Sequence, residues 1–224
     1  KIDAGGYMST IAGTGYGGYN SDNIPATAAM LNAPAGIALD KYENVYVADY
    51  SNKRIRKIDG AGMITTVAGN GNAIYSGDGG PAIAASLGWP QGVAVDTLGN
   101  IFIADTWNNH IRKVNVFGFI SNIGGKDSSG HSGDGGPATN AKMWHPAGIA
   151  VDAAGNVLFT DMNNSVVRMI TPNGTIQHVT GSPFLGPGYQ DYVMPKGICI
   201  DGHNNIFVAF AGSHIVKTNR APLA

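Results

Sequence analysis

The feature that most constrains the fold is an internal repeat. A seven-residue motif begins with Pro, has Gly at its third position and ends in Asp. It occurs four times, as Pro34–Asp40, Pro90–Asp96, Pro146–Asp152 and Pro195–Asp201. Successive prolines are separated by 56, 56 and 49 residues. Such a period indicates that one supersecondary unit is copied along the chain, and that neighbouring copies bury each other's apolar faces.

Each copy is predicted to contain four short strands, which we call a, b, c and d. Strand a is the motif itself. The runs that follow it are mostly β-branched or aromatic and are separated by turns rich in Gly, Asn and Asp. No window of helical length shows an apolar period of 3.6 residues, and prolines stay outside the strand interiors. Repeated antiparallel units of this kind stack radially, so we expect an all-β chain that forms a β-propeller.

Three segments carry a family resemblance. Ser132–Ala138, Trp144–Asn156 and Ala104–Lys113 resemble the repeats of the NHL family. The resemblance extends over nearly the whole chain and implies a propeller of four-stranded antiparallel blades. It does not imply one function, because NHL-type propellers include protein-binding, RNA-binding and extracellular modules as well as related enzymes.

The repeats predict a single NHL-type propeller domain over residues 1–224, with four blades. Lys1–Tyr7 aligns with Lys57–Met63 at the end of a strand c, so the N-terminus has a spare strand d and the last repeat lacks one. We expect the two termini to share one blade, because this removes an exposed sheet edge. Two alternatives stay open, namely strand exchange between chains and a longer parent protein. The expected boundaries are 33–71, 89–125 and 145–181 for the full blades, 194–219 for strands a to c of the closing blade, and 1–15 for its strand d.

Composition narrows the class of partner. Charged residues make up only 13% of the chain and the formal net charge is −1, so no nucleic acid is expected to bind. No apolar run approaches the roughly 18 residues of a membrane span.

The lone Cys199 lies in an apolar run and is predicted to be a buried, inert thiol. Residue 1 is Lys rather than Met, so we expect a processed or excised piece.

Charged side chains recur at equivalent places in the repeats, and we interpret them as structural. Catalysis needs one constellation at one place, whereas a residue in every repeat belongs to the hydrogen bonding of the blade. One carboxylate in each d–a loop is too few for Ca²⁺, which takes about 6–8 oxygen ligands. We therefore predict no catalytic residue, no metal site and no cofactor. The recurring residues are Asp49, Asp105 and Asp161 after strand b, Arg54, Arg56, Arg112 and Arg168 in strand c, and Asp22, Asp78 and Asp134 in the d–a loops.

Two other functions remain as alternatives. A propeller-type lyase or lactonase needs carboxylates or histidines that converge on the channel. Among the residues that directly precede strand a, which are Ala33, Trp89, His145 and Met194, only His145 is a usual zinc ligand. An RNA-binding NHL module needs a basic face, and here many basic residues lie in strand c close to acidic ones.

Some equivalent positions of the repeats hold residues that differ from copy to copy, and these residues predict a binding face. Tyr50, Trp107 and Met162 lie in the b–c turns, while Trp89 and His145 lie just before strand a. In a propeller the b–c and d–a connections share one face, so these five side chains are expected to gather there. Aromatic and Met side chains are typical of binding surfaces. We therefore predict a non-enzymatic binding or scaffold module whose ligand is a protein, a peptide or a glycan.

Two sequons are present in predicted turns. They are Asn163-Asn164-Ser165 and Asn173-Gly174-Thr175, and each would accept an N-linked glycan if the protein were secreted. They favour an extracellular location.

Overall fold

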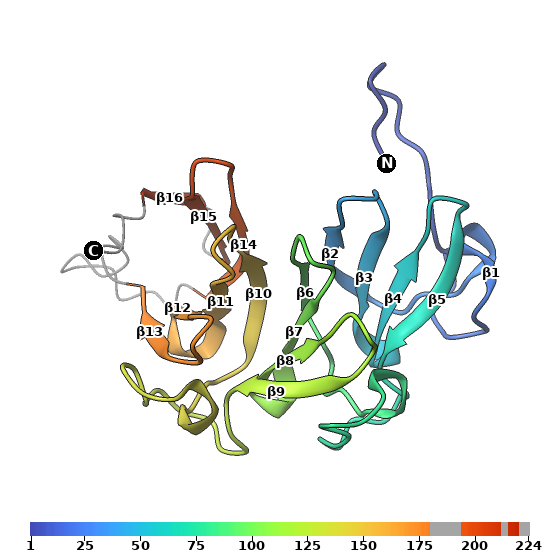
Figure 1. The fold of residues 1–224 in the computed structure, drawn as a ribbon. Coiled ribbons are helices and arrows are strands. Elements are labelled where there is room, and N and C mark those ends of the chain that lie inside the picture. The colour runs from blue at the N-terminus through green and yellow to red at the C-terminus, as the bar shows by residue number, and fades with distance from the viewer. Residues whose placement is uncertain (180–193, 212–214, 220–224) are drawn as a thin grey trace.

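The computed structural model describes residues 1–179, 194–211 and 215–219, and these residues form four antiparallel sheets (Figure 1). The prediction of an all-β propeller built from four repeats is confirmed. Blade 1 contains β2 (Pro34–Leu39), β3 (Val45–Asp49), β4 (Arg54–Ile58) and β5 (Met63–Ala68), and blade 2 contains β6 (Gly92–Val95), β7 (Ile101–Asp105), β8 (His110–Val114) and β9 (Ile120–Gly124). Blade 3 contains β10 (Pro146–Val151), β11 (Val157–Asp161), β12 (Val166–Ile170) and β13 (Ile176–His178), and blade 4 contains β14 (Pro195–Ile200), β15 (Asn205–Phe210) and β16 (Ile215–Asn219).

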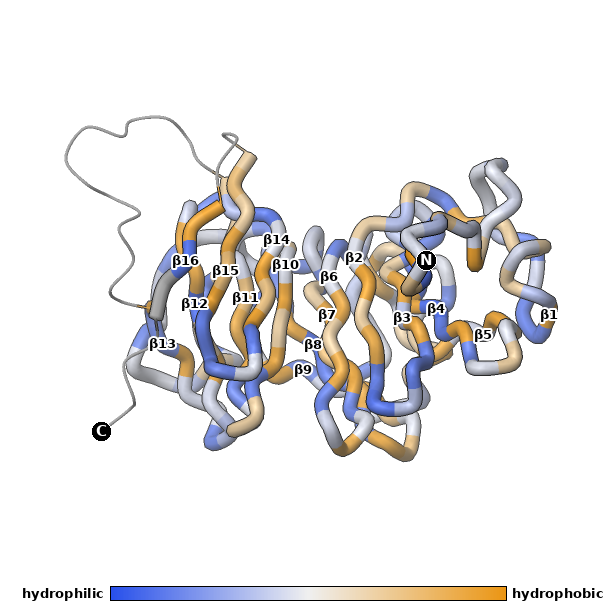
Figure 2. The backbone as a smooth tube through the Cα atoms, turned by 90° about the horizontal axis from the view of Figure 1, so that it is seen from above, coloured by the Kyte–Doolittle hydropathy of each residue, from blue (hydrophilic) through white to orange (hydrophobic). Residues whose placement is uncertain are grey.

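Each blade is an up-and-down sheet with strand a innermost. Along the chain β2 packs against β6, β6 against β10, and β10 against β14, so the four motifs line a common axis. Side chains alternate between the two faces of each strand, and every blade offers one face to the blade before it and one to the blade after it. The molecule is therefore an arc of stacked sheets, as the two perpendicular views show (Figures 1 and 2).

The d–a loop before each blade is part of the packing between blades. β1 (Ile24–Pro25) pairs with β5, and equivalent bridges join Pro81 to Phe119 and Pro137 to Thr175. After crossing the outer strand, the loop inserts small apolar side chains between two sheets. At the first junction Ala82, Ala85 and Leu87 are buried among residues of blades 1 and 2. The d–a loops are therefore part of the packing between adjacent blades.

The predicted sharing of one blade by the two termini is corrected by the structure. Residues 1–9 form a small hairpin of their own, with a bridge between Ile2 and Met8 and a hydrogen bond from the Ser9 amide to the Lys1 carbonyl. Within the described residues the sheet of blade 4 contains β14, β15 and β16, with β16 at its edge. The first and last blades stand at opposite ends of the arc (Figure 1), so strand d of the N-terminus is too far away to pair with β16.

Cys199 lies in β14 as predicted, but its side chain is exposed rather than buried. The sequence pattern suggested burial because both neighbours are Ile. The alternation of the strand turns Cys199 to the outer face of blade 4, which the described part of the chain leaves uncovered.

Candidate binding face

Three arginines are fully buried between a d–a loop and the sheet of its blade, each held by two carboxylates. The guanidinium of Arg112 lies 3.2 Å from Asp105 Oδ2, at the end of strand b, and 2.7 Å from Asp78 Oδ1, in the d–a loop. Arg56 and Arg168 make the same two contacts in blades 1 and 3, and the pairs are Arg56 with Asp49 and Asp22, and Arg168 with Asp161 and Asp134. These ion pairs are what the predicted structural role requires. Each network joins the loop to the sheet.

Arg54 is the exception in this group. Its guanidinium donates to the carbonyls of Asn52 and Asn70, at 2.9 and 3.0 Å, and stacks over the ring of Tyr19. It precedes Arg56 by two residues and so shares its face of β4, but it is only half-buried. It ties two turns together rather than neutralising a carboxylate.

The carboxylates at the end of strand b also hold the adjacent b–c turns. Burial raises the pKa of Asp105, and hydrogen bonds from Asn108, Gly88 and Arg112 oppose this rise. Its Oδ1 accepts the amide of Gly88 at 2.6 Å and the side-chain amide of Asn108 at 3.0 Å. One buried side chain therefore links the b–c turn to the segment that enters strand a. Asp161 does the same in blade 3, where it accepts the amide of Trp144 at 2.7 Å.

The b–c turns share an unusual backbone. In each of blades 1 to 3 a 3₁₀ turn follows strand b directly, and the turns are η2 (Tyr50–Asn52), η4 (Thr106–Asn108) and η6 (Met162–Asn164). The residue before strand a is left-handed in each of these blades, with φ of 50° at Ala33, 48° at Trp89 and 54° at His145. These values are sparsely populated for bulky residues, and such backbone strain concentrates at functional sites.

Four of the five predicted binding residues form one continuous aromatic row. The indole Nε1 of Trp107 donates to the hydroxyl of Tyr50 at 3.2 Å. The Trp107 ring centroid lies 5.0 Å from that of His145 and 5.5 Å from that of Trp89. The row thus runs from blade 1 through blade 2 to blade 3, with Trp107 at its centre. Trp107 is 53% exposed although it makes two ring contacts and one hydrogen bond.

Met162, the fifth predicted residue, adjoins the row through its backbone. Its amide donates to the carbonyl of His145 at 3.3 Å, and its side chain is half-buried. The next residue, Asn163, lies with its side-chain amide 3.1 Å from His145 Nδ1. Burial lowers the pKa of His145, so the imidazole is neutral at neutral pH and Nδ1 can accept from Asn163.

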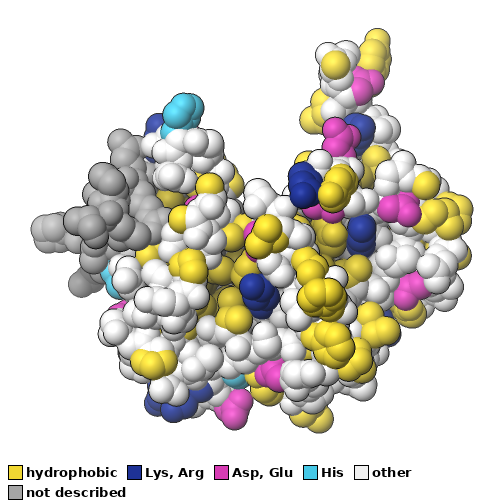
Figure 3. Space-filling model, viewed as in Figure 1, with side chains coloured by type: hydrophobic (Ala, Val, Ile, Leu, Met, Phe, Trp, Pro, Cys, Tyr) yellow, Lys and Arg dark blue, Asp and Glu magenta, His cyan; other side chains and the backbone are white. Residues whose placement is uncertain are grey.

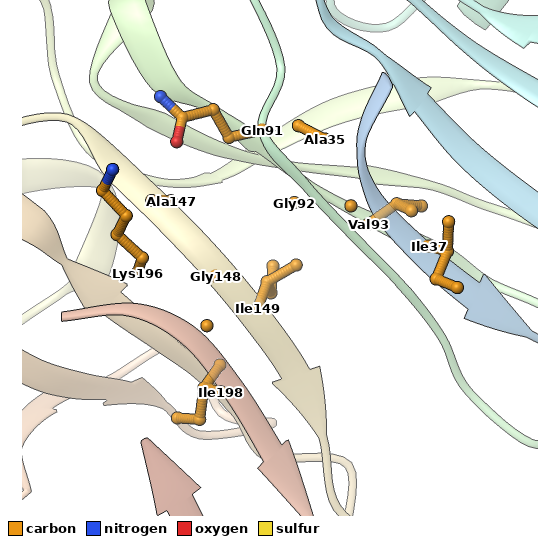
Figure 4. A pocket seen from close by; sticks show the side chains of 12 residues that line it. Ala35, Ile37, Gln91, Gly92, Val93, Ala147, Gly148, Ile149, Lys196 and Ile198 are labelled. Carbon is orange, nitrogen blue, oxygen red and sulfur yellow. The ribbon is translucent and has the colours of Figure 1, made fainter. Parts of the chain in front are cut away.

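The row stands beside the mouth of the central channel. A cavity of about 310 Å³ is lined by the first residues of the four inner strands. Figure 4 shows Gln91 and Lys196 at one end of it and Ile37, Ile149 and Ile198 at the other. Because Gln91 and Lys196 lie in strand a just past Trp89 and Met194, the polar end opens on the same face as the row. Neither residue was predicted, since both sit inside the repeat motif and differ from it only in side-chain chemistry.

Two neighbours of the row were also missed. Trp144 is 43% exposed and directly precedes His145. The ammonium of Lys53 lies 5.1 Å from the Trp89 ring centroid, which is a cation–π contact. A signal for Trp144 was available, because it occupies the repeat position held by Gly88 and Asn32, so its bulk departs from the repeat as Trp89 does.

The two sequons differ in accessibility. Asn163 is half-buried and its side-chain amide is engaged with His145. Asn173 is exposed in the turn between β12 and β13, at the opposite end of the blade from the row. Only Asn173 presents its side chain to solvent without a partner in the row.

These features define a class of protein, a repeat protein of the β-propeller type. Its blades carry a row of aromatic side chains on one face, and buried hydrogen bonds and ion pairs hold the turns that bear this row. A model of the teneurin NHL domain matches residues 17–76, 71–130 and 124–186. The chain therefore belongs to the NHL-repeat family, as its motifs predicted. No helix in the described ranges is long and apolar enough to cross a membrane.

Several much larger proteins contain a similar sequence in a small part of their length. The chain is 27% identical over 177 residues to the chloroplastic protein SUPPRESSOR OF QUENCHING 1 of Arabidopsis thaliana, covering 75% of the chain and 16% of that protein. It is 28% identical over 227 residues to teneurin-3 of Danio rerio, covering 87% of the chain and 8% of that protein. The chain is thus similar to one module of much larger proteins.

Solved structures show the same fold. A Bacteroides thetaiotaomicron protein of unknown function superposes with a TM-score of 0.62 at 21% identity, covering 82% of this chain and 46% of that one. A streptogramin B lyase superposes with a TM-score of 0.56 at 16% identity, covering 83% and 54%. At these identities the likeness shows the fold alone. The chain spans about half the length of these structures.

Proposed function

We propose that the chain is a non-enzymatic binding module, and that the aromatic row engages a protein, a peptide or a glycan. The observation that carries the proposal is the row itself. Trp107 is half-exposed yet held by Tyr50, His145 and Trp89, so its ring is oriented before any ligand arrives. Rigid Trp and Tyr rings are enriched among the residues that dominate binding energy.

The polar mouth of the channel supports a ligand with a polar group. The ammonium of Lys196 and the amide of Gln91 line the same cavity. A ligand that stacks on Trp107 and Trp89 could place a carbonyl, a carboxylate or a hydroxyl at this end. The row would then supply apolar contact and the mouth would supply orientation, which is the usual division of roles in a ligand site.

An enzymatic function of the lyase or lactonase kind draws less support. Its chemistry needs a convergent set of acids or bases, and the repeated carboxylates of blades 1 to 3 are instead engaged by arginines. Within the described ranges no group of three or more His, Cys, Asp or Glu side chains has an arrangement that could hold a metal ion. The lyase and gluconolactonase activities named for similar structures belong to those proteins.

The test uses a random peptide library displayed on phage and a glycan array, each probed with the wild-type chain. Trp107→Ala is expected to weaken the selected ligands at least thirtyfold, which is about 2 kcal/mol for a dominant contact residue. The matched control is Phe117→Ala, because Phe117 is 81% exposed in the turn between β8 and β9, at the opposite end of blade 2. Ligands that lose affinity with Phe117→Ala but keep it with Trp107→Ala and Trp89→Ala would overturn the proposal.

We further propose an extracellular location, with Asn173 as the glycan acceptor. The support is its exposed turn, whereas Asn163 is engaged in the row. Expression in a glycosylating host should give a mass shift that Asn173→Gln removes and Asn163→Gln does not. A secreted chain with no glycan, or with one at Asn163, would contradict this part of the proposal.

A further inference from the structure

A second cavity lies between blades 2 and 3, at the opposite end of the strands from the aromatic row. Its volume is about 560 Å³, against about 310 Å³ for the cavity of the channel. The a–b turns of both blades, the c–d turn of blade 3 and the d–a loop between the blades line it, and we call it the junction cleft. Figure 3 looks onto this face, where hydrophobic side chains gather over the turns of blade 2. Blades 2 and 3 each have a neighbouring blade on both sides, so the described chain itself shapes the cleft.

The floor of the junction cleft is apolar. It includes Phe102 and Ile123 of blade 2, together with Val157 and Ile170 of blade 3. All four side chains belong to one core cluster, in which Ile123 is partly buried and the others are buried. A molecule that enters the cleft would therefore contact the edge of the core. A mostly apolar cavity of this size with a few polar groups is typical of small-molecule sites.

The rim of the junction cleft has short side chains at positions where the preceding repeat has long ones. Thr139 and Ala154 are exposed and line the cleft. Ile83 and Leu98 occupy the equivalent positions at the junction between blades 1 and 2. The short side chains leave the apolar floor accessible from solvent. The cleft thus arises from residues that differ between the copies of the repeat.

Lys113 supplies a positive charge to the junction cleft. Its ammonium lies 5.5 Å from the centroid of the Phe102 ring, and among the described residues it takes part in no ion pair. The other charged residue of the lining is Asp96, whose carboxylate accepts two backbone amides and the side-chain amide of Asn100 at 2.7–3.0 Å. Asp96 is therefore engaged within its own turn, whereas the ammonium of Lys113 can bind an added anion. An ammonium and a carboxylate form a charge-assisted hydrogen bond, which is stronger than a neutral one.

We propose that the junction cleft binds a small molecule that has an apolar body and one carboxylate. The apolar body lies on Phe102, Ile123 and Ile170, and the carboxylate accepts a hydrogen bond from the ammonium of Lys113. A neutral molecule of the same shape keeps the apolar contact and loses the charged one. The ammonium therefore sets the specificity of the site, and the floor supplies the rest of the affinity.

The test compares octanoate with octanol, which has the same chain length and a hydroxyl in place of the carboxylate. Each is titrated calorimetrically into the chain produced in a bacterial host, so that Asn173 at the cleft carries no glycan. The expected Kd is below about 1 mM for octanoate. Octanol is expected to bind at least tenfold more weakly, because it lacks the hydrogen bond between charged groups.

One substitution isolates the ammonium. Lys113→Met keeps an unbranched side chain and introduces the residue that blade 3 has at this position, Met169. It is expected to remove the preference, so that octanoate binds no better than octanol. Lys57→Met is the matched control, because Lys57 is the equivalent lysine of blade 1 and lies outside the lining of the cleft. It should leave both affinities unchanged.

The methyl signals of isoleucine locate the ligand in the wild-type chain. Octanoate should shift the signals of Ile123 and Ile170 and leave those of Ile37 and Ile198, which line the channel, in place. Shifts confined to Ile37 and Ile198 would put the ligand in the channel and overturn the proposal. Equal affinities of the wild-type chain for octanoate and octanol would also overturn it, as would the lack of saturable octanoate binding up to about 10 mM. Trp107→Ala should leave octanoate binding unchanged, so this test is separate from the test of the aromatic row.

Discussion

Blades 2 and 4 share the register of strands b and c, but they fill one equivalent position with different chemistry, an ion pair in blade 2 and apolar side chains in blade 4. In blade 2 Arg112 pairs in register with Ile103, and its guanidinium contacts Asp105. In blade 4 the equivalent register pair is Val208 with Val216, and Phe210 stands where strand b of the other blades ends in Asp. Arg112 and Asp105 are fully buried, and Val208 and Phe210 are buried in an apolar cluster against which the partly buried Val216 packs. The blade does not need the ion pair in order to form.

This difference between blades 2 and 4 indicates the role of the ion pair between Asp105 and Arg112. Replacing a buried ion pair with apolar groups of similar volume is often neutral or stabilising, so such a pair is weak evidence of stability. In blade 2, however, Asp105 also holds the Gly88 amide and the Asn108 side chain, and these flank Trp89 and Trp107. In blade 4 the residue that follows strand b is Ala211, and the row does not reach it. The polar networks thus occur in the blades whose turns carry the aromatic row.

The largest expected effect comes from breaking one network. Arg112→Met should lower the free energy of unfolding by about 3–5 kcal/mol, because it leaves the buried Asp105 carboxylate without its cation. Urea denaturation measures the loss. Arg54→Met is the matched control from another blade, since Arg54 donates to carbonyls rather than to a carboxylate, and we expect it to cost about 1 kcal/mol.

A second substitution sharpens this result. The double variant Asp105→Asn with Arg112→Met should be more stable than Arg112→Met alone. Asparagine removes the buried charge, and its Oδ1 can still accept the Gly88 amide. If the double variant were the less stable of the two, the cost would arise from lost packing rather than from the unpaired charge.

The glycines of the inner strands give the next largest effect. Gly92→Ala should destabilise the fold by about 1–3 kcal/mol, because the new Cβ atom collides with the Ala147 carbonyl. Gly197→Ala, at the equivalent place in blade 4, should leave the thermal midpoint within about 1 °C of wild type, because a Cβ atom there would meet only Ala209 Cβ, at an ordinary 3.6 Å, in the described chain. Equal losses for both variants would mean that the junction contact is not what makes Gly92 necessary.

The order of the blades could be predicted from the sequence, and so could much of the site. The Pro-x-Gly motif marks strand a, and its period fixes equivalent positions, so Tyr50, Trp89, Trp107, His145 and Met162 could be assigned to one face without coordinates. The contact between Asp78 and Arg112 could not be predicted as a pair. It depends on the d–a loop crossing the sheet face, which a local pattern does not specify.

Closure of the ring could not be predicted for a related reason. The spare strand d at residues 7–12 and the missing one in blade 4 are complementary as sequences. Whether they meet depends on the rotation between successive blades, and that rotation is set by packing at junctions such as Gly92 with Ala147. Four blades rotated in this way form an arc, so the N-terminal segment pairs with itself instead.

A smaller effect concerns pH. Burial lowers the pKa of His145 from the usual 6.5, so the folded chain binds this proton less readily than the unfolded chain does. The contribution of neutral His145 is present above the unfolded pKa and is lost as the pH falls through the folded pKa. An NMR titration should therefore place the His145 midpoint below 6.5. A midpoint at or above 6.5 would mean that the imidazole is not held neutral within the row.

The most direct measurement of the central claim follows the three tryptophans during binding. The chain contains three Trp residues, so selective ¹⁵N labelling gives three indole signals, which Trp89, Trp107 and Trp144 variants assign. On titration with a ligand selected by the wild-type chain, the account predicts the largest shift for Trp107, a smaller one for Trp89, and no change for ¹⁹F-labelled Phe117. A ligand that binds while all three indole signals stay in place, or that perturbs only Phe117, would contradict it.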